Sequence, residues 1–380
     1  MSTSAEVVII GGGVIGASIA YHLASRGVRG IVVLERDALG AGSTSRNAGG
    51  IRLQFSSEIN VRLSQRSLPR FRAFEAELGI DPAFHQVGYL FLVTTDRDEV
   101  AFTRSLALWE RLGVPARRLD RAAAQALFPQ CRMDDVRFAT FCAEDGYADP
   151  SSILHGYVGA ARRLGVAFRE GAAVTAVETA GGRVTAVRAG DERIGCGRVI
   201  VAAGAWAGEV ARLAGVELPI RPLRRHIFVT DAVPGIDRDF PMTIDFASGL
   251  YLHRESGGVL LGMADPAEPV AFDQSVNWDF LPVVVERALA RVPALEHATV
   301  RTGWAGLYED TPDRHPVIGP AGADGLLVCA GFSGHGFMHA PAAGELVAEL
   351  VVDGRTTLDL GALRASRFAS GELVSEHNVV

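Results

Sequence analysis

The 380-residue sequence predicts an α/β fold, with a Rossmann-like dinucleotide-binding domain and an α+β second domain built on an antiparallel sheet. Three observations support this. A strand, a glycine-rich turn, a helix and a second strand open the chain, and two later segments repeat the order strand, glycine, helix. The intervening stretches, 85–146 and 219–300, are richer in alternating strand patterns. We expect a discontinuous first domain of residues 1–84, 147–218 and 301–380, with the intervening stretches forming a substrate-binding domain that caps it.

The opening unit covers residues 7–35, with the turn Gly11-x-Gly13-x-x-Gly16 between its first strand and a helix expected at 17–26. Glycines at these positions permit the tight bend, the approach of backbone to a pyrophosphate, and close packing of helix on strand. Glu35 follows the second strand, 19 residues after Gly16. Its carboxylate can accept hydrogen bonds from ribose hydroxyls. The unit predicts a bound dinucleotide without distinguishing NAD from FAD.

The two later repeats lie near the middle and in the last third of the chain. Strand 198–203 runs into Gly204 and a helix at 205–214, and strand 325–330 runs into the glycine-rich segment 331–336 and a helix at about 341–352. Ligands of open α/β sheets bind at the carboxyl ends of the strands. We therefore expect the three junctions to meet at one site.

The segment 40–52, rich in glycine and small hydroxylated residues, favours FAD. Such a chain can follow a long, extended cofactor, and the junction at 331–336 offers a second, distant contact. A flexible surface loop or lid is the alternative for this segment. The residues expected to contact the cofactor are Gly11, Gly13, Val14, Ile15, Gly16, Glu35, Arg36, Gly42, Ser43, Thr44, Arg46, Asn47, Gly49, Gly50, Val174, Ala203, Gly204, Gly331, Gly334, His335, Gly336, Phe337 and Met338.

Composition argues against several other classes of protein. A net charge of −7 gives no basic excess for nucleic acid. The four cysteines are far apart without a Cys-x-x-Cys pair, so we expect buried thiols and no metal site. No apolar run approaches the roughly 18 residues of a membrane span. The first strand follows the N-terminus without a leader pattern, which predicts a cytoplasmic protein.

Taken with further motifs, these features resemble the amino-acid oxidase and sarcosine oxidase (DAO) family of flavoproteins, and most closely the β subunits of sarcosine oxidase and L-proline dehydrogenase. The resemblance covers almost the whole chain. It implies oxidation of a small amino acid, preferably a secondary amine such as sarcosine or L-proline, by hydride transfer from Cα–H to flavin N5. Besides the opening turn, the motifs that carry it are at residues 42–46, 50–55, 88–91, 304–308, 311–313 and 331–338.

The resemblance also implies roles in substrate binding. Arg52 falls where sarcosine oxidases place an arginine on the substrate carboxylate, a geometry that guanidinium suits; a surface or flavin-contacting arginine is the alternative. D-amino-acid and glycine oxidases have an arginine at the place of Tyr308. We therefore expect Arg52 to be the carboxylate anchor and Tyr308 to be a catalytic and substrate-binding wall of the cavity, although a tyrosine packed between domains fits as well.

Acid–base and electrostatic roles complete the expected site. His226, interpreted as the start of a strand, could accept the amine proton, or could be a structural histidine. Tyr251 is a similar candidate for catalysis and substrate binding. The helix that begins after Gly334 could stabilise the negative charge of reduced flavin near N1 and C2=O. His335 could instead cap that helix.

The chain departs from the family pattern at three positions. Gly306 replaces the cysteine that joins flavin covalently in monomeric sarcosine oxidases, so we expect non-covalent FAD. Leu260 replaces the lysine that promotes reaction with oxygen, and Met338, expected in the substrate site, replaces a second lysine. A dehydrogenase is therefore favoured over an oxidase, with electrons passing to a carrier or an α-type partner subunit, which could hold FMN at the interface. Oxidation of a primary D-amino acid, glycine or a 2-hydroxy acid stays open, as does an electron-relay subunit of a heteromeric complex.

Overall fold

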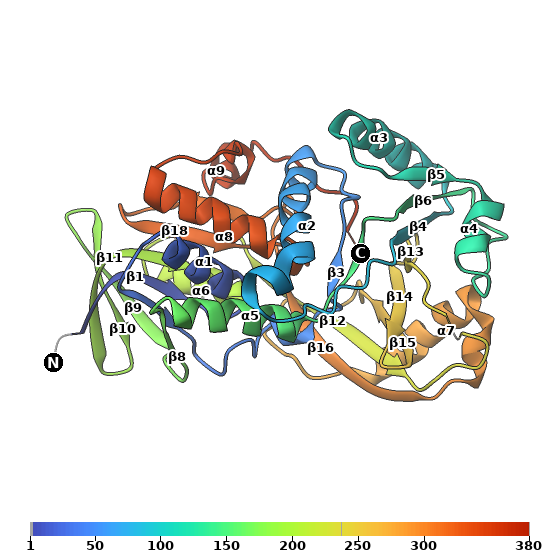
Figure 1. Cartoon of the computed structure of the whole chain (residues 1–380), viewed down its shortest axis with the longest axis horizontal. Helices are drawn as coiled ribbons and strands as arrows, with labels where there is room; N and C mark the ends of the chain where they lie inside the picture. Colours follow the sequence, from blue (N-terminus) through green and yellow to red (C-terminus); the bar gives the residue numbers. More distant parts are fainter. Residues whose placement is uncertain (1–2, 237, 380) are drawn as a thin grey trace.

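The structure is a computed structural model that describes residues 3–236 and 238–379. Its first sheet has eight strands, with β17, β18, β11, β1, β2 and β8 side by side and a β9–β10 hairpin attached to β11 (Figure 1). The core strands pair in parallel, whereas β17 and the hairpin pair antiparallel. The strands are β1 (Thr3–Ile10), β2 (Ile31–Leu34), β8 (Ala167–Arg169), β9 (Val174–Ala180), β10 (Arg183–Ala189), β11 (Glu192–Val201), β17 (Val317–Pro320) and β18 (Leu326–Ala330).

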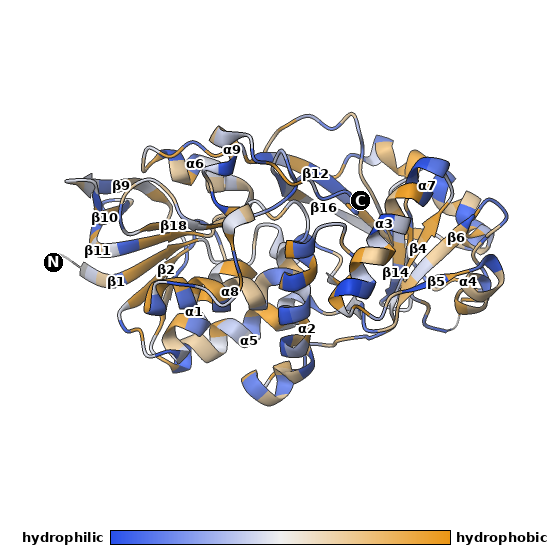
Figure 2. Ribbon diagram, turned by 90° about the horizontal axis from the view of Figure 1, so that it is seen from above, coloured by the Kyte–Doolittle hydropathy of each residue, from blue (hydrophilic) through white to orange (hydrophobic). Residues whose placement is uncertain are grey.

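Both faces of this sheet are covered, which explains why its central strands are continuous apolar runs. Alternate residues of β1 point to opposite faces: Val7 and Ile9 pack in one cluster with helices α1, α5 and α8, and Val8 in another with α6 and the hairpin. The central strands β1, β2 and β18 accordingly appear largely hydrophobic in Figure 2. The helices of this part are α1 (Val14–Ser25), α2 (Glu58–Leu78), α5 (Pro150–Arg163), α6 (Ala207–Arg212), α8 (Gly336–Asp353) and α9 (Arg367–Ser370).

The second sheet also has eight strands, in the order β16, β12, β15, β14, β13, β4, β6, β5. Its neighbours pair antiparallel except β13 and β4, which are parallel. The strands are β4 (Tyr89–Val93), β5 (Arg117–Leu119), β6 (Phe138–Cys142), β12 (Arg221–Thr230), β13 (Met242–Asp245), β14 (Leu250–Glu255), β15 (Gly258–Met263) and β16 (Val300–Asp310). Helices α3 (Asp96–Leu112), α4 (Arg121–Leu127) and α7 (Leu281–Arg291) accompany this sheet. Figure 1 shows α2 between the two sheets.

Three segments differ from the sequence-based expectation. Strand β16 pairs with β12 along most of its length, so residues 300–310 belong to the second sheet and not to the first domain. Helix α8 begins at Gly336, five residues before the proline that we expected to open it. The expected helix at 205–214 is a 3-10 turn, Gly204–Trp206, followed by the short α6. The pairing of β16 corrects one boundary of the expected two-domain division, and the rest of that division stays a proposal.

A two-stranded ladder of β3 (Gly50–Ile51) and β7 (Gly146–Tyr147) lies near the junction of the two sheets. The remaining 3-10 turns are Thr44–Arg46, Trp278–Phe280, Pro293–His297 and Gly361–Leu363. Among the described residues, no helix combines the length and apolarity that crossing a bilayer requires.

Candidate cofactor and substrate cavity

A cavity of about 500 Å³ lies where the carboxyl ends of the first sheet meet the second sheet. Gly11 after β1, Ala203 after β11 and Gly334 after β18 all line it, so the three strand–glycine–helix junctions meet there. Tyr251 and Ile227 line it from the second sheet. The expected cofactor residues in its lining are Gly11, Gly13, Val14, Ile15, Glu35, Arg36, Gly42, Ser43, Thr44, Arg46, Asn47, Gly50, Val174, Ala203, Gly204, Gly334, His335, Gly336, Phe337 and Met338.

The opening turn leaves no room for side chains. Gly11 has a φ of +117°, and a Cβ there would collide with the carbonyl oxygen of Ala202. A Cβ on Gly16 would collide with the carbonyl of Gly11, because the helix packs tightly on the turn. The Oγ1 atom of Thr44 accepts a hydrogen bond from Val14 N, at the start of α1, over 3.0 Å. The result is a backbone cradle at a helix N-terminus, which fits a pyrophosphate.

Glu35 lies beside this cradle. Its carboxylate accepts hydrogen bonds from the backbone N–H of Gly12 at 2.7 Å and of Asp37 at 2.8 Å. The guanidinium of Arg36 lies 4.4 Å from the centre of the Trp206 ring, which also lines the cavity. These residues could hold the nucleotide end of a dinucleotide.

The segment 40–50 is anchored on β16. Ser43 Oγ donates to the Leu307 carbonyl at 2.6 Å, and Arg46 Nη1 donates to the Ala305 carbonyl at 3.1 Å. In return, Trp304 Nε1 donates to the Arg46 carbonyl at 3.1 Å. The segment 40–50 is therefore packed against the second sheet and is not a free surface loop.

Arg52 lies in the cavity wall as a buried cation, with 5% of its surface exposed. Its Nη1 atom donates to the Gln54 carbonyl at 2.9 Å, and Nη2 donates to the Asn378 carbonyl at 2.5 Å. No carboxylate of the described residues forms an ion pair with it. Burial lowers the pKa of Arg52, yet guanidinium stays charged at neutral pH. An unpaired buried cation is costly, so this position favours an anionic ligand.

Three tyrosines, Tyr89, Tyr251 and Tyr308, line the same cavity. Burial raises the pKa of Tyr251 and Tyr308, so both hydroxyls are protonated and can donate at neutral pH. Glycines leave room for two of the rings, because a Cβ on Gly334 would collide with the Tyr308 ring and a Cβ on Gly262 with the Tyr251 ring. The wall thus offers neutral hydroxyl groups.

His335 faces Arg52, with its Nε2 atom 3.4 Å from Arg52 Nη2. Burial, followed by the charge of Arg52, lowers the pKa of His335 well below its usual value, so the ring is neutral. It makes no side-chain cap on α8. Phe337 and Met338, in the first turn of α8, line the cavity.

The structure contradicts the expected role of His226. The residue lies in the middle of β12, where Arg225 and Ile227 point into the cavity and His226 points to the opposite face. Its Nε2 atom accepts a hydrogen bond from Asn277 N at 3.1 Å, and its ring packs near Phe280. His226 is therefore a structural histidine of the second sheet and not a base in the cavity.

Three expected cofactor contacts also lie outside the cavity lining: Gly16, Gly49 and Gly331. Gly49 and Gly331 have φ of +70° and +83°, in the region that favours glycine. A Cβ on Gly49 would collide with the Ala148 carbonyl, and one on Gly331 would crowd Thr311. These glycines shape the backbone around the site.

Several lining residues were not predicted, namely Tyr89, Trp206, Arg225, Gln274 and Glu309. Two signals could have found some of them. Arg225 alternates with the expected strand residue His226, and Glu309 follows Tyr308 directly in a motif already singled out. Gln274 lies in an irregular segment for which sequence gives no orientation. Burial raises the pKa of Glu309 to about 7.

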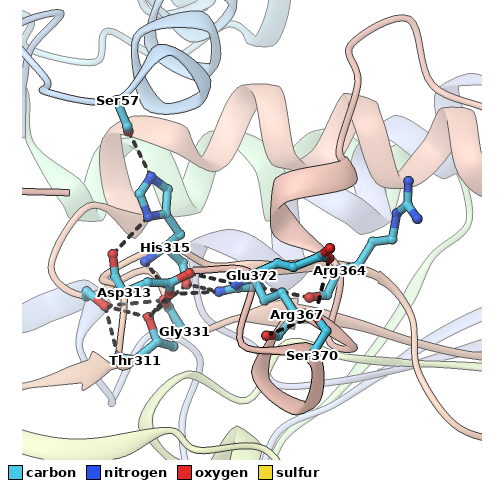
Figure 3. Close-up of polar contacts among 10 residues, drawn as sticks. Ser57, Thr311, Asp313, His315, Gly331, Arg364, Arg367, Ser370 and Glu372 are labelled. Carbon is cyan, nitrogen blue, oxygen red and sulfur yellow. Dashed lines mark hydrogen bonds and ion pairs between the residues drawn. The ribbon is translucent and has the colours of Figure 1, made fainter. Parts of the chain in front are cut away.

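Ser57, Asp313 and His315 lie close together in a polar cluster, which is structural (Figure 3). The Nε2 atom of His315 lies 2.8 Å from Ser57 Oγ, but its Nδ1 contacts the backbone carbonyl of Asp313 at 2.9 Å, not the carboxylate. The Asp313 carboxylate instead pairs with buried Arg367 at 2.7 Å. The set lacks the carboxylate–imidazole contact of a nucleophilic triad.

All four cysteines are free and buried, as expected. In the described part of the chain, no group of three His, Cys, Asp or Glu side chains could hold a metal ion.

The model of the family described as FAD dependent oxidoreductase, DAO, matches residues 6–350. The chain belongs to this family. A relative from Xenopus laevis, FAD-dependent oxidoreductase domain-containing protein 1, is 36% identical over 99% of this chain and 85% of its own. Dimethylglycine dehydrogenase of Rattus norvegicus is 30% identical over 96% of this chain, which spans only 45% of that protein.

Among solved structures, L-proline dehydrogenase from P. horikoshii has a TM-score of 0.92 and 33% identity, over 98% of this chain and 100% of that chain. Glycine oxidase from Geobacillus kaustophilus has a TM-score of 0.87 and 27% identity, over 96% of this chain and 99% of that one. The protein is thus an FAD-dependent oxidoreductase of the DAO fold. The glycine cradle and the cavity that it lines fit FAD, so fold class, family and cofactor are confirmed.

Proposed function

We propose that this oxidoreductase oxidises the amine carbon of a small amino acid, preferably a secondary amine such as sarcosine or L-proline, to the imine. The observation that carries the proposal is Arg52, a buried cation in the cavity wall without a paired carboxylate. Three of its five N–H groups have contacts in the structure, with Gln54, Asn378 and His335. The remaining donors are available to a substrate carboxylate.

When bound, FAD would supply the two-electron acceptor for the hydride, two electrons and one proton, that leaves the substrate carbon. The amine N–H proton is lost to solvent, a C=N bond forms, and water later hydrolyses the imine. The chain's own contribution is to orient and desolvate the substrate. Arg52 holds the carboxylate, Tyr251 and Tyr308 offer hydroxyl groups, and Phe337 with Met338 supplies apolar wall.

Among the described residues, the only histidine in the cavity lining is His335, which is neutral and faces Arg52. Because His226 lies on the other side of the sheet, and because burial and the charge of Arg52 lower the pKa of His335 so far that it is a weak base, no imidazole of the described residues is suited to take the amine proton. We therefore propose that the amine binds after losing its proton. This predicts that the rate at low substrate rises with pH through the amine's own pKa.

The names of relatives support an amine substrate. Dimethylglycine dehydrogenase and L-proline dehydrogenase, whose names specify secondary or tertiary amines, are at 30% and 33% identity. Leu260, where sarcosine oxidases carry a lysine, is buried in β15 and offers no charged group that could promote reaction with oxygen. We propose non-covalent FAD and an acceptor other than oxygen, which is either a carrier or an α-type partner subunit.

The test is anaerobic mixing of the FAD-loaded protein with N-methyl, cyclic and primary amino acids and with 2-hydroxy acids. We expect sarcosine or L-proline to remove the oxidised flavin absorbance. Reduction by 2-hydroxy acids alone would overturn the amine assignment. Rapid reoxidation of the reduced protein in air-saturated buffer, at a rate typical of oxidases, would overturn the assignment of the acceptor.

A further inference from the structure

A second arginine, Arg225, lines the cavity from β12. Its Nε atom is buried and has no hydrogen-bond partner, and its Nη1 atom donates only to the backbone carbonyl of Arg224, at 2.9 Å. The guanidinium lies 4.9 Å from the centre of the Tyr308 ring. Arg225 is therefore a half-buried cation that faces the cavity with free hydrogen-bonding capacity.

The adjacent arginine of β12, Arg224, is fully paired and offers a comparison. Arg224 points to the other face, where it forms ion pairs with Glu268, at 2.8 Å, and with Asp273. It also donates to Ser275. No carboxylate of the described residues lies within ion-pair distance of Arg225. Glu268 and Asp273 therefore pair with Arg224, and Arg225 has no carboxylate partner among the described residues.

Gln274 adds a second unpartnered donor. It stands between the two residues that bind Arg224, Asp273 and Ser275, so this loop is held in place. Its own side chain lines the cavity, and its Nε2 atom is buried without a hydrogen-bond partner. Buried donors without acceptors cost free energy. Two such donors, from separate elements and in one cavity, indicate an acceptor supplied by a ligand.

Three acids of the cavity lining, Glu35, Asp37 and Glu309, are already engaged by other groups. Glu35 is bonded to two backbone N–H groups, Asp37 pairs with Arg36, and Glu309 accepts from Gly331 N at 2.8 Å. Arg225 and Arg52 both line the cavity, and both charges oppose the rise that burial causes in the pKa of Tyr308. One amino-acid carboxylate can neutralise only one of them.

We propose that Arg225 and Gln274 form a second anion-binding position, and that within the proposed class of secondary amines the cavity binds an amino acid with two carboxylates better than sarcosine or L-proline, which have one. Arg52 holds the first carboxylate and Arg225 the second. This inference rests on the proposed function, because it assigns the substrate class of the same cavity. Secondary amines of this class include iminodiacetate and N-methyl-aspartate.

Binding can be tested without turnover, which separates this inference from the proposed function. Glutarate and butyrate, a dicarboxylate and a monocarboxylate that cannot be oxidised at an amine, are titrated into the FAD-loaded protein, and the flavin spectrum reports binding. We expect glutarate to bind at least about tenfold more tightly, as a charge-assisted guanidinium contact predicts. Arg225→Met and Gln274→Leu should each reduce this preference, whereas Arg221→Met, on the exposed end of the same strand, should keep it.

Equal binding of glutarate and butyrate by the unaltered protein would overturn the inference. So would an Arg225→Met protein that loses FAD affinity but keeps the preference, because Arg225 would then serve the cofactor. If Arg225→Met does not fold, the preference for glutarate over butyrate in Gln274→Leu decides the question by itself. Flavin reduction by iminodiacetate and N-methyl-aspartate in preference to sarcosine would extend the result to turnover, and failure of every amino acid to reduce the flavin would refute only the proposed function.

Discussion

The Nη2 atom of Arg52 donates a hydrogen bond of 2.5 Å to the backbone carbonyl of Asn378, a residue 326 positions away. The segment around Asn378 is fixed by Glu376, which is 1% exposed. The Glu376 carboxylate accepts hydrogen bonds from Ser56 N and Oγ, Ser57 N and Oγ, Asn60 Nδ2 and Asn378 N. Residues 376–378 therefore hold both Arg52 and the chain that follows it.

We predict that Glu376→Gln loosens this arrangement. Burial alone would raise the pKa of Glu376, but the hydrogen bonds from Ser56 and Ser57 keep this pKa below its usual value, so the carboxylate is ionised. Glutamine places an N–H₂ group among donors, at a cost of about 2 kcal/mol in the free energy of unfolding. Urea denaturation with saturating FAD measures this, and butyrate titration should show weaker binding. The exposed Glu372→Gln is the control, and equal behaviour of the two variants would contradict the prediction.

Gly16→Ala should abolish or severely weaken FAD binding, because the added Cβ collides with the Gly11 carbonyl and opens the turn. Gly159→Ala is the matched control: it is also helical, and its Cβ would meet only the Arg163 side chain at 3.5 Å. FAD affinity is measured by the recovery of flavin absorbance in stripped protein. Equal affinities in the two variants would show that the turn does not form the cofactor cradle.

His226→Gln should leave the rate of anaerobic flavin reduction and its pH profile unchanged. The side chain lies on the face of β12 away from the cavity, and glutamine can still accept from Asn277 N. Rapid mixing across a series of pH values provides the measurement. Loss of a titrating limb in the variant would restore His226 as an acid–base group.

Asp145 should give the folded protein a pH-dependent stability. It is fully buried, accepts from Leu53 N at 2.9 Å and Gln54 Nε2 at 3.1 Å, and burial raises its pKa to about 7. Between the unfolded pKa, about 3.9, and about 7, the native state binds the extra proton. The free energy of unfolding therefore falls as pH rises through this window, by at most about 4 kcal/mol. Urea denaturation at pH 5.5 and 7.5 should show a smaller difference for Asp145→Asn, and identical differences would refute the assignment.

The nucleotide-binding part of the fold was largely predictable, because its signals are local. Each of the three junctions combines a short apolar strand with a glycine, and the structure brings Gly11, Ala203 and Gly334 together at one cavity. The boundary at β16 was not predictable. Its partner β12 is far away in sequence, and nothing in the local pattern of residues 300–310 says which sheet they join.

In the substrate half, sequence identified residue types but not the faces on which they lie. His226 and Arg225 are neighbours in one strand, and a one-residue difference reverses which of them reaches the cavity. The contact between Arg52 and Asn378 depends on a segment without secondary structure, so no periodic sequence pattern predicts it. Gln274 was missed for the same reason.

The central claim is that Arg52 binds the carboxylate of an amino acid that reduces the flavin, and one comparison tests it most directly. The rate of anaerobic flavin reduction by the best amino acid of the substrate screen is measured at limiting substrate in the unaltered protein, in Arg52→Lys and in Arg52→Met, beside the same substrate as its uncharged amide. We predict that the unaltered protein prefers the acid to the amide by about a hundredfold or more, that Arg52→Lys keeps part of this preference, and that Arg52→Met loses it. An unchanged preference in Arg52→Met would contradict the account.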